Sequence, residues 1–168
     1  MGLAEDCQKR SKTSKKTALE NNGTMKTFNF RIFFLCEDWQ SLERANTLKE
    51  KLKENCRHQA VIEADFCEYA RLCHPRLRES ATQKAMGADM LIVSAVGTDA
   101  FPGFVQDWMN ELDALCTEKI VCAEFLGAKS SEDAQIFHRF LDKWTSQRGG
   151  FLFSNLFPDS RAAAMAGS

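Results

Sequence analysis

Short apolar runs alternate with amphipathic stretches along most of the chain. The run Phe28–Leu35 is dense in side chains that favour extended backbone, which predicts a strand. Four more apolar runs, at Gln59–Ala64, Met90–Ala95, 119–126 and 149–157, predict four further strands. The sequence therefore indicates five strands, the last of them the weakest.

Between these runs, apolar residues recur every three or four positions, as in helices that bury one face. The expected helices cover residues 38–55, 75–86, 102–116 and 130–146. The side chains expected to face inward are Leu42, Ala45, Leu48 and Leu52, then Leu77, Ala81 and Ala85, then Phe104, Val105, Trp108, Leu112 and Leu115. Pro75 suits a first helical turn, and Gly87 is expected to end that helix in a left-handed conformation. Residues 65–74 are interpreted as a loop or a partial helical turn.

Strands that alternate with helices are typical of an α/β protein with a parallel sheet. Right-handed crossovers then predict a three-layer sandwich with a five-stranded parallel sheet in the flavodoxin-like order 2-1-3-4-5. In this order the direction of winding changes between the first and third strands. Ligands of such sheets bind at that switch point. The loops expected there are Cys36–Gln40 and Ser94–Gly103.

The expected domain covers residues 27–157 and has polar or small-residue segments on both sides. Residues 1–26 are rich in Lys, Ser, Thr and Asn and are expected to form a disordered basic tail. Met25 is an alternative start of translation by its position. Residues 158–168 are expected to form a flexible C-terminal tail.

Charge and cysteine content narrow the classes of partner and location. Residues 1–24 hold five basic and three acidic side chains, so a net charge of −1 leaves −3 for the rest. An acidic body argues against nucleic-acid binding. No apolar run approaches the roughly 20 residues that span a bilayer, and no signal-peptide pattern begins the chain, so we expect no membrane contact. Seven cysteines without a C-x-x-C pair favour reduced thiols and a cytoplasmic location.

The first switch-point loop carries two carboxylates, Glu37 and Asp38, directly after a strand. Carboxylates at a strand end could bind Mg²⁺. The favoured interpretation is that Asp38 caps the helix that begins near Trp39. Neither the G-x-G-x-x-G pattern nor phosphate-loop glycines are present, which argues against Rossmann-type dinucleotide binding and against P-loop phosphate transfer. We expect no cofactor and no metal.

The second loop offers Ser94, Gly97, Thr98 and Asp99 to a small polar ligand such as a nucleotide. Ordinary turn chemistry explains the same residues and is favoured. Phe101 and Phe104 are candidates to cover the cleft.

Histidines and cysteines form no recognisable catalytic or metal-binding pattern in the sequence. Cys67, Cys73 and His74 fit no strong zinc template. His138 is expected to pack rather than react. Whether Cys36, at the mouth of the expected cleft, is reactive stays open at this point.

The layout resembles the receiver domain of two-component signalling, because Glu37 and Asp38 match the acidic pair after its first strand. That family has a phosphoaccepting aspartate where the third strand here ends in Ser94-Ala95-Val96, and a lysine that "FLFSNLF" lacks. The resemblance therefore implies a degenerate receiver-like scaffold.

Residues 30–125 also resemble a Toll/interleukin-receptor-like domain through "FRIFFLCED" and "LIVSAVGTDAFPGFVQDWMNEL". In enzymatic members a helix glutamate acts in NAD cleavage, and Glu111 is the matching residue, with Ser94 and Asp38 lining the site. As an alternative, Glu111 and Asp107 simply form a solvated acidic face. The combination of "FRIFFLCEDWQS", "HPRLRE" and "ADMLIVSAVG" with "WMNEL" resembles small bacterial proteins that carry no assigned activity.

These observations favour a non-enzymatic regulatory or interaction domain. Its apolar surfaces are compatible with a homodimer or another protein partner. The alternative is a Toll/interleukin-receptor-like or nucleoside-type hydrolase that cleaves an N-glycosidic bond of NAD or a nucleotide through Glu111. Whether the chain is an enzyme is left undecided by the sequence.

Overall fold

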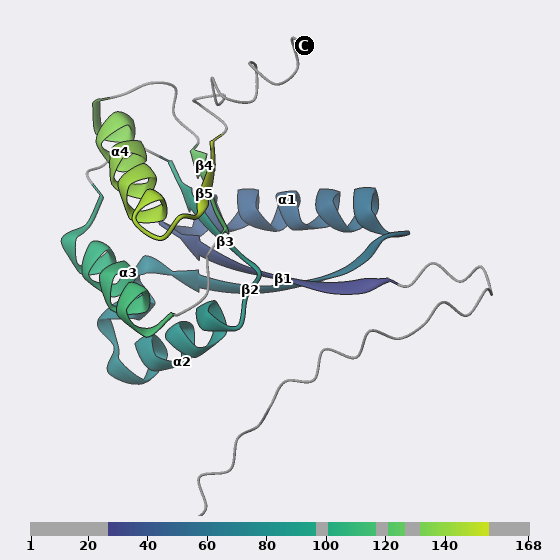
Figure 1. Cartoon of the computed structure of the whole chain (residues 1–168), viewed down its shortest axis with the longest axis horizontal. Coiled ribbons are helices and arrows are strands. Elements are labelled where there is room, and N and C mark those ends of the chain that lie inside the picture. Colours follow the sequence, from purple (N-terminus) through teal and green to yellow (C-terminus); the bar gives the residue numbers. More distant parts are fainter. Residues whose placement is uncertain (1–26, 97–100, 117–120, 127–131, 155–168) are drawn as a thin grey trace, which may run out of the picture.

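The computed structural model describes residues 27–96, 101–116, 121–126 and 132–154. Strands and helices alternate through these ranges in chain order (Figure 1). The elements are β1 (Phe28–Cys36), α1 (Trp39–Cys56), β2 (Ala60–Glu68), the 3₁₀ helix η1 (Tyr69–Cys73), α2 (Pro75–Met86), β3 (Met90–Ala95), α3 (Gly103–Leu115), β4 (Val121–Leu126), α4 (Glu132–Ser146) and β5 (Phe151–Ser154).

The strands form one sheet in the order β2-β1-β3-β4-β5, and every neighbouring pair is parallel. This confirms the α/β class and the strand order expected from the sequence. β1 lies between β2 and β3, and its residue Leu35 is in register with Val93. The carboxyl ends of β1 and β3 therefore lie side by side, as the switch-point argument requires.

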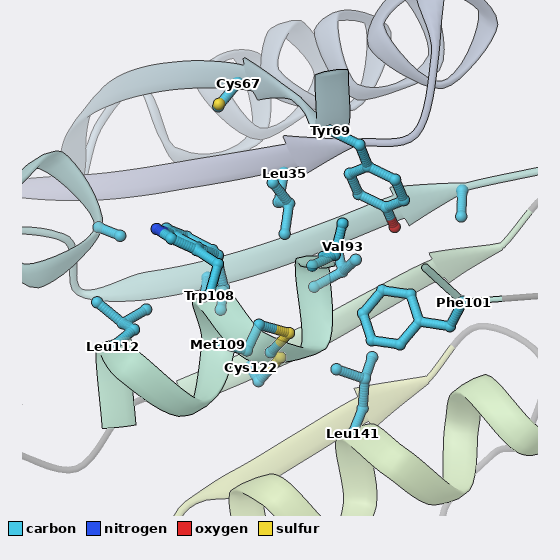
Figure 2. Close-up of a cluster of buried hydrophobic side chains, with 14 of the residues drawn as sticks. Leu35, Cys67, Tyr69, Val93, Phe101, Trp108, Met109, Leu112, Cys122 and Leu141 are labelled. Atoms are coloured by element: carbon cyan, nitrogen blue, oxygen red, sulfur yellow. The ribbon is translucent and has the colours of Figure 1, made fainter. Parts of the chain in front are cut away.

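Apolar side chains fill both faces of the sheet, but the two layers differ in size. On one face, α2, α3 and α4 bury a large cluster against odd-numbered β1 residues such as Phe33 and Leu35. Figure 2 shows part of this cluster, with Trp108 and Met109 from α3 beneath Leu35 and Val93. On the other face, α1 packs mainly on β1, β2 and β3. One helix thus forms the second layer among the described residues.

Helix α3 confirms the centre of the expected stripe, at Val105, Trp108 and Leu112, but not its margins. Val105, Trp108, Met109 and Leu112 are fully buried, which is the i, i+3, i+4, i+7 spacing of one helical face. The expectation that Phe104 and Leu115 also face inward was wrong, because these side chains lie at the exposed margin. The buried Trp108 indole is satisfied by its Nε1–H, which donates to Thr82 Oγ1 over 2.9 Å.

Three further expectations around α2 were wrong. Residues 65–74 were expected to form a loop or a partial helical turn, but Asp65–Glu68 extend β2 by pairing with Phe33–Cys36 of β1, and only Tyr69–Cys73 form a helical turn, η1. Leu77 is exposed rather than inward. Gly87 adopts right-handed backbone with φ −88°, and its N–H bonds the carbonyls of the last helical turn. No left-handed reversal is needed, because the chain continues directly into β3.

None of the helices in the described ranges combines the length and the apolar character that a bilayer span needs. The tails expected at residues 1–26 and 158–168 lie outside the described residues.

Candidate functional site at the carboxyl edge of the sheet

Glu37 leaves β1 at the edge where β3 also ends. Its backbone N–H donates to Ser94 O over 2.9 Å, which extends the pairing of the two strands by one residue. Its carboxylate Oε2 accepts the N–H of Val96 over 2.5 Å. Glu37 is half-buried. Its carboxylate therefore binds the chain that leaves β3 and holds the two outgoing segments together.

Asp38 caps α1, as favoured from the sequence. Its Oδ1 accepts the N–H of Ser41 over 2.8 Å, and its carbonyl accepts the N–H of Leu42 over 2.9 Å. The side chain is thus engaged in the geometry that a helix N-cap needs. Within the described ranges, no three or more His, Cys, Asp or Glu side chains are grouped so as to hold a metal ion.

Ser94 is completely buried beneath the start of α1. Its Oγ–H donates to the carbonyl of Ser41 over 3.0 Å, so the hydroxyl ties β3 to the first turn of the helix. Gly97, Thr98 and Asp99 lie outside the described residues. Phe101 does not cover a cleft: it is buried against Phe137 with ring centroids 4.5 Å apart.

Arg44 is a residue of this edge that sequence reasoning missed. Its guanidinium donates to the carbonyl of Ala95 over 3.1 Å and to that of Phe125 over 3.2 Å. The same group stacks over the Phe125 ring, 4.6 Å from its centroid. Desolvation lowers the Arg44 pKa, while the nearby Asp38 and Glu37 charges act in the opposite direction. The signal available in the sequence was its spacing of three residues from the inward-facing Ser41.

Tyr69 also escaped the sequence analysis, although it is the single tyrosine of the chain. It is buried against Phe101, and Figure 2 shows its hydroxyl oxygen on the Phe101 side of the ring. The hydroxyl has no hydrogen-bond partner among the described residues. Burial raises the Tyr69 pKa well above its usual value, and the negative charge of Glu37 adds to this. Tyr69 therefore stays a neutral phenol.

Cys36 lies at the end of β1 and is fully buried. Burial raises the pKa of its thiol to about 12, and neighbouring Cys67, Glu68 and Asp38 contribute in the same direction. Because the thiolate is the nucleophile in cysteine chemistry, this thiol is a poor nucleophile near neutral pH. The structure thus answers the question of Cys36 reactivity that the sequence left open.

Glu111 lies on the exposed side of α3 and pairs with α2. Its two carboxylate oxygens accept from Arg78, at 2.7 Å from Nη2 and 3.1 Å from Nε. Among the described residues, no hydrogen bond or ion pair joins Glu111 to Asp38 or Ser94. The residues proposed for the hydrolase are therefore not brought together by the contacts that the structure shows.

A second polar cluster joins β4, α4 and β5 through Glu124. This carboxylate is buried, and its Oε1 lies 2.7 Å from His138 Nδ1 and also accepts from Ser154 Oγ. The expectation that His138 only packs was incomplete, because its ring contacts this buried acid. No sequence pattern indicated this cluster, because its three residues are at least 14 positions apart and meet only through the fold.

Comparison with known proteins assigns neither a family nor an activity to this chain. No family model and no curated protein matches the chain. A solved structure of S. aureus homoserine dehydrogenase at pH 6.0 is similar over 78% of this chain, with 8% identity and a TM-score of 0.44. The matched region covers 33% of the length of that protein. A likeness this distant supports no statement about activity.

Proposed function

We propose that this chain is a non-enzymatic interaction domain built on a degenerate receiver-like scaffold. The observation that carries the proposal is how the polar side chains at the carboxyl ends of β1 and β3 are used. Glu37, Asp38 and Ser94 each bond the chain's own backbone, at Val96, Ser41 and Ser41 respectively. These bonds hold Val96, directly after β3, and the first turn of α1, so the three side chains serve to position the chain's own backbone.

An aromatic groove beside α1 is the surface that we propose for a protein partner. Trp39 is 63% exposed at the start of α1, and Phe66 stacks on Phe34 with ring centroids 4.9 Å apart. A groove of about 330 Å³ lies between α1 and the edge strand β2, lined by Trp39, Leu42, Glu43, Asn46 and Phe66. Aromatic side chains of this kind supply much of the binding energy in protein interfaces. A partner with an apolar anchor side chain suits this groove.

The hydrolase is the rival function, and one assay separates the two. Full-length protein is incubated with NAD, and with adenine and guanine nucleotides, and release of nicotinamide or free base is followed by chromatography. The interaction-domain proposal expects no release above that of buffer. Asp107→Asn is the matched control for Glu111→Gln, because Asp107 is also exposed on α3.

Turnover that disappears in Glu111→Gln and survives in Asp107→Asn would contradict the proposal. It would also identify Glu111 as catalytic despite its ion pair with Arg78. A homodimer, a small nucleotide ligand and a cytoplasmic location stay predictions. Light scattering and equilibrium dialysis with nucleotides measure the first two directly.

A further inference from the structure

Residues 69–86, which include η1 and α2, are positively charged, whereas the body around them is acidic. Four basic side chains and one acidic side chain give this segment a net charge of +3, with its histidine counted as neutral. Because residues 25–168 carry −3 in all, the remainder of those residues carries −6. A local concentration of one sign of charge attracts partners of the opposite sign. An anionic partner is therefore drawn to η1 and α2 rather than to the rest of the body.

A small hollow lies between this segment and the edge strand β2. Its volume is about 50 Å³. Arg71 of η1 and the sheet residue Cys67 form part of its lining. The rest includes Leu77, Ser80 and Lys84, whose spacing of three and four places them on one face of α2. The hollow thus has a cation on each of the two helical elements that border it.

The two cations of the hollow have donors to spare. Lys84 Nζ lies 2.7 Å from Asp65 Oδ1, which leaves two of its three N–H donors. Arg71 is exposed and has no hydrogen-bond or ion-pair partner in the part of the chain that the structure describes. Burial raises the pKa of the Cys67 thiol, while the charges of Arg71 and Lys84 act in the opposite direction. Both charges therefore lie close to the same sulfur atom, at the border of the hollow.

The size of the hollow and the charges around it favour a carboxylate. A volume of about 50 Å³ is less than that of two molecules of liquid water, at about 30 Å³ each. It admits a carboxylate group but no nucleobase or sugar. Asp65, Glu68 and Glu79 lie on the same two elements or directly before η1, and they would repel the closely spaced phosphates of a nucleic acid. A guanidinium with all of its donors available binds a carboxylate through two parallel hydrogen bonds.

We propose that this hollow binds an aspartate or glutamate side chain of an acidic protein segment, with Arg71 and Lys84 as its charged contacts. Leu77 is 42% exposed beside the two cations, so it offers an apolar contact to a residue next to the bound acid. In Figure 1, α1 and α2 lie on opposite sides of β1 and β2. The surface is thus distinct from the aromatic groove beside α1, and the proposal does not rest on that groove.

Selection of short random peptides displayed on phage, with the full-length protein as bait, tests the proposal. We expect the recovered peptides to be enriched in Asp or Glu next to an apolar residue. A labelled peptide from this set should bind more weakly as the NaCl concentration rises. Arg71→Gln should lower its affinity at least about tenfold, because the charge-assisted bonds are lost. Lys84→Gln should lower it about twofold to fivefold, as for an exposed ion pair.

Two control variants determine where the peptide binds. Lys143→Gln removes an exposed positive charge from α4, which packs on β4 and β5 at the other edge of the sheet. Trp39→Ala removes the exposed aromatic side chain of the groove beside α1. Neither change should alter the affinity, whereas replacing the acidic residue of the peptide by its amide should lower it as much as Arg71→Gln does.

Four results would overturn the proposal. The first is a set of recovered peptides without enrichment in acidic residues. The second is an affinity that survives Arg71→Gln or falls equally in Lys143→Gln, which would indicate attraction to net charge alone. The third is loss of binding in Trp39→Ala, which would assign the peptide to the aromatic groove and leave the interaction-domain proposal standing. The fourth is tighter binding of single-stranded RNA that Arg71→Gln abolishes, which would assign the cations to a nucleic acid.

Discussion

Arg44 joins α1 to the carboxyl ends of β3 and β4, and its replacement by alanine tests the structural role assigned to the side chains at this edge of the sheet. The guanidinium makes two hydrogen bonds, to Ala95 O and Phe125 O, and stacks on the Phe125 ring. A hydrogen bond from a charged donor contributes about 1.5–3 kcal/mol, and an exposed cation–π contact about 0.5–1 kcal/mol. Both N–H···O distances are long for hydrogen bonds, and the Arg44 side chain is half-exposed, so each bond is expected to contribute less than that range. We therefore expect Arg44→Ala to lower the free energy of unfolding by about 2–3 kcal/mol.

Two companion variants separate the geometry of the guanidinium from its charge. Arg44→Lys keeps the positive charge but loses the planar fork that reaches both carbonyls, so we expect it to recover no more than about half of the loss. Lys51→Ala removes an exposed positive charge from α1, two helical turns after Arg44, and should change the free energy of unfolding by about 0.5 kcal/mol or less.

Urea unfolding followed by tryptophan fluorescence measures all three variants, because Trp108 and Trp144 are buried. The comparison requires an unchanged dependence of the free energy on urea, which shows that the unfolded states are alike. An Arg44→Ala protein within about 0.5 kcal/mol of the parent would refute the reasoning. Full recovery in Arg44→Lys would also refute it, since a single ammonium cannot reproduce both bonds.

Two further predictions concern the interior. The Cys36 pKa is raised from 9.0 to about 12 in the folded protein, so its contribution to stability is complete below pH 9 and is lost as the pH rises toward 12. This group should lower the free energy of unfolding over that window by up to about 1.4 kcal/mol per pH unit. Urea titrations at several pH values measure this fall, which should be shallower in Cys36→Ala. Equal slopes in the two proteins would rule out a raised Cys36 pKa as the cause. Leu112→Ala should cost about 2–5 kcal/mol because the side chain is fully buried, while Leu115→Ala, on the exposed margin of the same helix, should cost about 0.5 kcal/mol or less. Comparable losses in calorimetry or urea unfolding would show that the burial of α3 is misassigned.

The order of elements and the sheet topology could be read from the sequence because they depend on local patterns. Apolar runs, helical spacing and right-handed connections together leave few arrangements for this chain. The N-cap at Asp38 was also predictable, since a cap involves a side chain and backbone three residues away. The expectation that β1 and β3 end side by side followed from the predicted strand order, and the pairing of the two strands confirms it.

The hydrogen-bond partners of Glu37 and Ser94 could not be predicted from the sequence in this way. Glu37 bonds Val96 across 59 positions, and Ser94 bonds Ser41 across 53 positions. A single sequence lists such groups without their partners, so a structural carboxylate and a ligand-binding one look the same. The missed Arg44 shows the same limit, because its two carbonyl acceptors come from β3 and β4.

Apolar residues that recur every second position in strands and every third or fourth position in helices determined where these elements lie and which faces they bury. The margins of those faces were decided by packing, which is why Phe104 and Leu77 are exposed although their spacing fits a buried stripe. Tertiary structure alone decided that α1 stands by itself over one face of the sheet, leaving Phe151 and Phe153 uncovered among the described residues. The physical reason is that periodicity is a property of neighbouring residues, whereas burial depends on every element that happens to share a layer.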